Sequence, residues 1–101
     1  MFDKIKQAME MQKKAREIQK ELASSRTEAV RLDGKIKVVI SADYKVQDVT
    51  IDRSVLSQDN KHILEQAIKE CFQEALKKVQ DIAMAKIKKI TGDVDIGSLL
   101  R

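Results

Sequence analysis

The chain has 101 residues, 43% of them hydrophobic and 36% charged, which allows one globular domain and excludes a disordered chain. No run approaches the roughly 20 apolar residues of a transmembrane span, and residues 1–6 show no signal peptide, so we expect a cytoplasmic protein. The net charge is +4, and its positive excess lies in residues 1–24 and 53–90, while residues 25–52 are neutral. This distribution favours an anionic partner for those two segments.

Residues 2–24 have the pattern of a helix with one thin apolar seam. The seam residues are spaced alternately by three and four: Ala8, Met11, Ala15, Ile18 and Leu22. This is the period of a helix that packs along another helix. We expect the partner to be the long helix described below, from the same chain or from a second copy.

Residues 27–52 change to a period of two, which is typical of strands. Asp33-Gly34 is a hairpin signal because glycine accepts the positive φ of a type I′ turn. The residues between 42 and 45 are a plausible second turn. Ile36, Val38 and Ile40 alternate on one face, and Val49 and Ile51 follow in a third strand. The segment therefore predicts a three-stranded antiparallel meander, and we expect Ile51 in the core.

The stretch from Asn60 to Ile90 is one long amphipathic helix, and we expect Phe72, on its apolar stripe, to lie in the core between the sheet and this helix. Its length would be roughly 45 Å, whereas a compact chain of this size has a radius of gyration near 13 Å. The helix must therefore extend beyond its own domain, either to meet a second chain or to project as a prong. We expect one domain over residues 1–101, with residues 92–101 as a mobile tail.

The residues needed for catalysis are scarce. His62 is the only histidine, Cys71 is the only cysteine, and the chain has three glycines. No nucleophile motif, zinc-ligand spacing or glycine-rich phosphate loop is present. We therefore expect no enzyme activity, no cofactor and no metal site, and we interpret Cys71 as a small core residue.

The candidate functional residues are basic side chains on the two helices. They are Lys13, Lys14, Arg16 and Lys20 on the first, and Lys77, Lys78, Lys86, Lys88 and Lys89 on the second. An ordinary structural interpretation is available, since Lys88 and Lys89 can offset the helix dipole and Lys14 can pair with Glu10. With few aromatic residues to stack on bases, any nucleic-acid contact would be to phosphates and weakly sequence-selective.

Several segments resemble one known family. They are Ala8-Met9-Glu10-Met11-Gln12-Lys13-Lys14, Lys37-Val38-Val39-Ile40, Val49-Thr50-Ile51-Asp52 followed by Ser54-Val55-Leu56, and Cys71-Phe72-Gln73-Glu74-Ala75. Together they are similar to the YbaB/EbfC family of bacterial nucleoid-associated proteins, over about residues 2–92. Arg53 stands where the family pattern usually has proline.

The resemblance implies an α+β fold in the order α-β-β-β-α and a homodimer with projecting helix pairs. It also implies a nucleoid location and double-stranded DNA bound by the helical parts, without a membrane partner. On this basis we predict phosphate contacts from seven residues: Lys13, Lys14, Arg16, Lys20, Lys86, Lys88 and Lys89. The alternative is a dimeric scaffold or adaptor for a protein partner in replication, recombination or translation.

Overall fold

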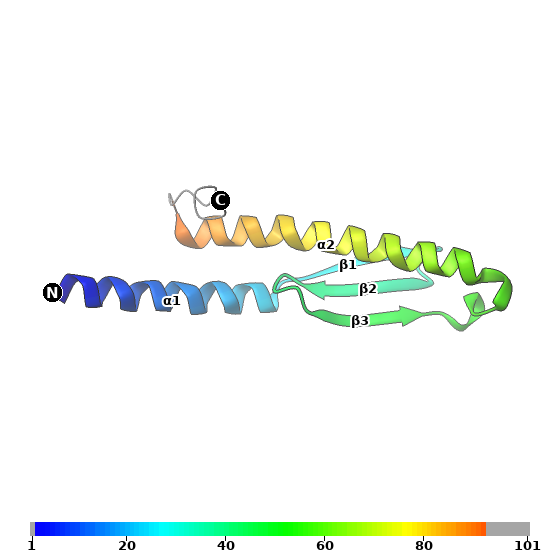
Figure 1. Ribbon diagram of the computed structural model, residues 1–101, viewed down its shortest axis with the longest axis horizontal. Coiled ribbons are helices and arrows are strands. Elements are labelled where there is room, and N and C mark those ends of the chain that lie inside the picture. The colour runs from blue at the N-terminus through cyan, green and yellow to red at the C-terminus, as the bar shows by residue number, and fades with distance from the viewer. Residues whose placement is uncertain (1, 93–101) are drawn as a thin grey trace.

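A computed structural model describes residues 2–92 of the chain and confirms the α+β order (Figure 1). The elements are α1 (Phe2–Ser24), β1 (Arg26–Arg31), β2 (Ile36–Ser41), β3 (Val46–Ile51) and α2 (Lys61–Thr91), with short 3₁₀ turns at Arg53–Val55 and Gln58–Asn60. The tail expected at residues 92–101 lies, apart from Gly92, outside the described residues.

The three strands form one antiparallel sheet in the order β1-β2-β3. In the first turn Asp33 and Gly34 have φ values of 58° and 82°, and the Lys35 amide donates to the Leu32 carbonyl over 3.1 Å. The hairpin is therefore confirmed at Asp33-Gly34, but Leu32 also takes a positive φ of 54° and the loop between the strands spans four residues, 32–35, rather than two. The second turn is also where the sequence predicted it, and there Tyr44 takes a positive φ of 66°.

The core lies between α2 and the first two strands. On α2 the buried residues recur every four positions and all are small: Ala67, Cys71, Ala75, Val79 and Ala83. They let the helix come close to Ile36, Val38 and Ile40, which are at most 1% exposed. Full burial stabilises each such aliphatic side chain by about 1.5–3 kcal/mol relative to an exposed one.

The prediction that Ile51 lies in the core is wrong for this chain. Ile51 shares the helix-facing side of the sheet with Ile36, its register partner, but it remains 37% exposed. The reason is width, since a helix about 10 Å across spans roughly two strands at about 4.8 Å each. Here α2 packs on β1 and β2. Phe72 packs at the margin of the core and is only partly buried.

The molecule is an elongated rod of 68 × 22 × 17 Å. This shape is the one expected when a helix is longer than the domain to which it belongs. Both helices leave the same end of the sheet and lie side by side beyond it, and α1 extends further than α2 (Figure 1). We call α1 together with residues 80–91 of α2 the prong. The sheet with residues 61–79 of α2 is the body. Neither helix is long and apolar enough, within residues 2–92, to cross a membrane.

Candidate nucleic-acid interface

The first helix of the prong has no buried residue along its whole length. Its inner seam faces α2 only at the sheet end, where Ile18 and Leu22 are half-buried. There Lys86 of α2 forms an ion pair with Glu21 of α1 over 3.3 Å. A hollow between the two helices is lined by Leu22, Tyr44, Ala83, Met84 and others. The prong is thus joined at its base and open to solvent along the rest of α1.

A second row of residues runs along the opposite side of α1, and we call it the outer stripe. Its members are spaced by four and three in alternation, which keeps them on one side of a helix: Phe2, Lys6, Met9, Lys13, Arg16 and Lys20. All are exposed. A shallow hollow on this side is lined by Lys6, Met9, Glu10, Lys13 and Arg16. The outer stripe therefore presents four cations in a line.

The predicted residues of α1 do not all share that side. Successive helical residues are about 100° apart, so Lys14 lies well away from the line through Lys13 and Lys20. It lies instead near Glu10, Glu17 and Glu21, which follow the same flank at helical spacing. Lys6 was missed by the sequence prediction, although its spacing of seven from Lys13, and of fourteen from Lys20, was a readable signal.

The predicted residues of α2 lie in its last two turns. Lys88 and Lys89 are exposed, and the Lys88 carbonyl accepts the amide of Gly92, which ends the helix with a φ of 67°. Lys86 is half-buried, and its ammonium group already contacts Glu21. Lys86 therefore links the two helices, whereas Lys88 and Lys89 offer their charges to solvent.

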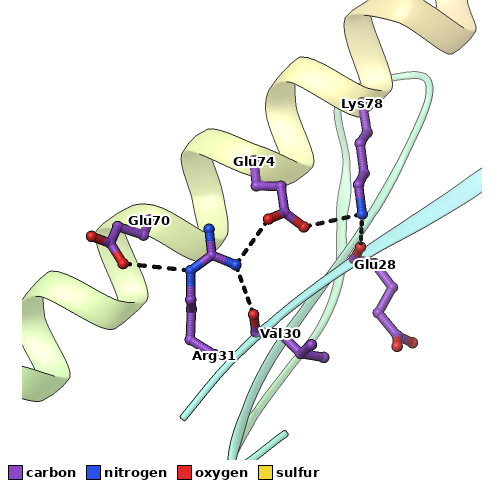
Figure 2. A network of polar contacts seen from close by, with 6 residues as sticks. All are labelled: Glu28, Val30, Arg31, Glu70, Glu74 and Lys78. Atoms are coloured by element: carbon purple, nitrogen blue, oxygen red, sulfur yellow. Dashed lines mark hydrogen bonds and ion pairs between the residues drawn. The ribbon is translucent and has the colours of Figure 1, made fainter. Parts of the chain in front are cut away.

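In the body, positively charged side chains are paired with acidic ones, as Figure 2 shows at the edge of β1. The Arg31 guanidinium contacts Glu74 over 2.8 Å and Glu70 over 3.4 Å, and Lys78 contacts Glu74 over 3.0 Å. Lys78 also donates to the Glu28 carbonyl over 2.9 Å. The hydrogen bond from Arg31, and then that from Lys78, lowers the pKa of the Glu74 carboxyl. These positive charges are neutralised within the body, and the contacts fasten α2 to β1.

The His, Cys, Asp and Glu side chains are the remaining candidates for metal or thiol chemistry. Within residues 2–92, no group of three or more His, Cys, Asp and Glu side chains is placed to hold a metal ion. Cys71 is a buried free thiol, and burial raises its pKa. A raised pKa reduces the thiolate fraction, as expected for a structural core cysteine.

Three proteins that are similar to this chain in sequence are all named nucleoid-associated proteins. A nucleoid-associated protein of Corynebacterium urealyticum is 36% identical over 87 residues, covering 86% of this chain and 83% of that protein. One from Akkermansia muciniphila is 28% identical and covers 91% and 88%. One from Rickettsia felis is 36% identical over 64 residues, and that match spans 60% of its length.

The fold has a counterpart among crystal structures. An uncharacterized protein from Helicobacter pylori superposes with a TM-score of 0.64 at 15% identity, covering 77% of this chain and 90% of that one. At that identity the likeness concerns the fold alone. The model of the YbaB/EbfC DNA-binding family matches residues 1–94, which is nearly the whole chain. The chain therefore belongs to the YbaB/EbfC DNA-binding family of nucleoid-associated proteins.

Proposed function

We propose that this protein binds double-stranded DNA as a homodimer, mainly through phosphates and with little sequence specificity, at the nucleoid in the cytoplasm. The observation that carries the proposal is the outer stripe of α1, where Lys6, Lys13, Arg16 and Lys20 stand exposed on one side of a projecting helix. None of the ion pairs found within residues 2–92 involves these four side chains.

The chemistry of the stripe supports backbone contacts rather than base reading. From Lys6 to Lys20 it extends about 21 Å at 1.5 Å per residue, a length comparable with several successive phosphates of one DNA strand. Lysine binds phosphate as a point charge, and although lysine and arginine also contact guanine, the side chains that read adenine edges are asparagine and glutamine. The stripe's six positions contain neither of these amides.

Dimerisation is supported by an apolar surface that the chain leaves uncovered. On β3, Val46, Val49 and Ile51 are 53%, 45% and 37% exposed. On α2, Leu64, Ile68 and Phe72 follow each other at intervals of four along the flank opposite the row of Glu70, Glu74 and Lys78 that contacts β1. We call these six residues the β3 surface.

A second copy is the occupant that best suits the β3 surface. A sheet with a half-covered apolar face is stabilised when a further helix or sheet buries the remainder, and a twofold pairing lets each chain cover the other in the same way. Leu56, 59% exposed, extends this surface past the end of β3. The pairing would also bring two prongs, and two outer stripes, onto one particle.

The DNA test is a binding titration on several unrelated duplexes at two or more salt concentrations. If a dimer contacts six to eight phosphates, the slope of log K against log salt should be about −5 to −7, from roughly −0.9 per phosphate. Affinities should be similar among sequences. The scaffold alternative instead predicts little affinity for any duplex at physiological salt, and that result would exclude DNA binding as the main activity.

The dimer test is light scattering at micromolar concentration, which should give about twice the 11.5 kDa chain mass. Val49→Lys should lower the mass towards that of one chain, because it places a charge in the β3 surface. Thr50→Lys is the matched control, since Thr50 pairs with Lys37 on the opposite face of the sheet and should leave the mass unchanged. A folded monomer in the parent protein would contradict the homodimer.

A further inference from the structure

The outer stripe changes character towards the free end of α1. Lys13, Arg16 and Lys20 lie near the sheet, whereas the free end carries Phe2 and Met9 with Ile5 beside them. These three apolar side chains are 88%, 65% and 60% exposed, respectively. We call Phe2, Ile5 and Met9 the apolar tip. Large apolar side chains gathered on one exposed surface usually mark a contact with a partner.

Among the described residues, 2–92, none covers the apolar tip, whose three side chains are all exposed. The first half of α1 extends past the last described turn of α2, so the long helix ends before reaching it (Figure 1). The tip also lies on the side of α1 opposite the seam that faces α2. Whatever covers the tip therefore approaches from the same side as the partner of the basic residues.

The apolar tip follows directly on the basic residues of the outer stripe, and this position indicates which partner would cover it. A polyanion that follows Lys20, Arg16 and Lys13 along the stripe arrives next at Met9, Ile5 and Phe2. Lys6 lies among these apolar residues and keeps a positive charge at the tip. Phenylalanine, isoleucine and methionine belong to the side chains that enter between DNA base steps, unstack them and kink the duplex.

We propose that the apolar tip acts as a wedge, inserting Phe2, with Ile5 and Met9 behind it, at a base step of duplex DNA whose backbone is held by the basic part of the outer stripe. This inference rests on the proposed DNA binding. It adds a second activity, because a protein that contacts only phosphates leaves the duplex stacked, whereas a wedge bends it. The tip would then prefer steps that unstack easily, without reading base edges.

A tryptophan reporter tests the insertion directly, because the chain contains no tryptophan. Phe2→Trp should be strongly quenched on saturation with duplex DNA, since the indole would stack against bases. Met11→Trp is the matched control, because Met11 is 72% exposed but lies in the inner seam, on the other side of α1. Equal quenching of both reporters, or none in either, would overturn the wedge.

Bending gives an independent readout by energy transfer between dyes at the ends of a duplex of about 30 base pairs. The parent protein should bend it by about 20–90° and bind a centrally mismatched duplex about tenfold more tightly, because unstacking is cheaper there. The triple variant Phe2→Ala, Ile5→Ala and Met9→Ala should lose both effects. It should keep the parent's salt slope, since no charge is removed, and alanine favours the helix.

The outcomes separate this inference from the proposed function. A parent protein without salt-dependent DNA binding refutes the DNA-binding function itself. Salt-dependent binding with an unbent duplex refutes only the wedge. If the triple variant still bends DNA but has a smaller mass by light scattering, the apolar tip joins protein chains and the wedge is wrong.

Discussion

The body and the prong differ in how their side chains are used. Within residues 2–92, every buried hydrophobic residue except Ala83 lies in the body or in the turns beside it, and α1 contributes none. Cations show the same division, because Arg31 and Lys78 are neutralised by Glu74 in the body, while the outer stripe of the prong keeps its charges exposed. The body therefore determines stability, and the prong is available for binding.

This division has a physical cause in the lengths of the elements. Strands of six residues are shorter than α2, so the sheet covers only part of the helix, and the small buried residues that recur every four positions end at Ala83. Beyond the sheet a helix has only another helix to pack on, and α1 meets it mainly through Ile18, Leu22 and the contact of Lys86 with Glu21. Substitutions should accordingly have very different costs in the two regions.

The largest effect is expected when isoleucine is replaced by alanine in the body, and the same replacement in the prong serves as the comparison. Ile40→Ala in the body should lower the free energy of unfolding by about 2–5 kcal/mol, because Ile40 is 1% exposed and leaves a cavity. Ile5→Ala in the prong should change it by less than about 0.5 kcal/mol, because Ile5 is 60% exposed. Chemical denaturation measures both, and similar costs would contradict the division.

A smaller effect is expected from the contacts that fasten α2 to β1. Arg31, and then Lys78, lowers the pKa of Glu74 below its ordinary value of 4.5, so the folded state binds this proton less readily than the unfolded chain. The contribution is therefore fully present above about pH 4.5 and is lost as the pH falls through the folded pKa. Glu74→Gln should make the acid-induced loss of stability shallower, as measured by denaturation at several pH values.

The control for that measurement is Glu10→Gln in the prong. No ion pair within residues 2–92 includes Glu10, and its substitution should leave the acid profile unchanged. If Glu74→Gln also keeps the parent's profile, the contacts at the edge of β1 do not stabilise the fold.

The smallest effect is the expected difference in DNA binding between variants of two neighbouring lysines of the prong. Lys13→Ala should flatten the salt slope of DNA binding by up to about 2 units per dimer, at roughly 0.9 per phosphate and chain. Lys14→Ala should flatten it less, because Lys14 lies on the flank that carries Glu10 and Glu17. Titrations of the two variants on the same duplex compare them, and equal losses would show that DNA contacts more of α1 than the outer stripe.

Much of the fold could be predicted because its determinants are local. The alternation around Asp33-Gly34 defines a hairpin, and the four-residue recurrence from Ala67 to Val79 defines one face of α2. The environment of Ile51 could not be predicted in this way. Alternation tells which face of the sheet a residue occupies, but not which strands a single helix will cover.

The sequence predicted which helices carry the basic residues of the candidate site, but not how those side chains are arranged around the helices or which of them form ion pairs. The charge excess identified the helices, and spacing could have added Lys6, which shares a side with Lys13 and Lys20. The pairing of Lys86 with Glu21 joins residues 65 positions apart, so it depends on how the two helices meet. Whether the seven predicted residues contact DNA stays a prediction.

The central claim is that DNA is held by the outer stripe of the prong and not by positive charge in general. Its most direct test compares two triple variants that remove equal charge. One is Lys13→Ala, Arg16→Ala and Lys20→Ala in the prong; the other is Lys35→Ala, Arg53→Ala and Lys69→Ala, all exposed in the body and its turns.

We predict that the prong variant flattens the slope of log K against log salt by up to about 5 units per dimer, and that the body variant keeps a slope near the parent's. Both should unfold at the parent's denaturant concentration, because all six side chains are exposed. Equal losses of slope in the two variants would contradict the claim and assign the binding to net charge alone.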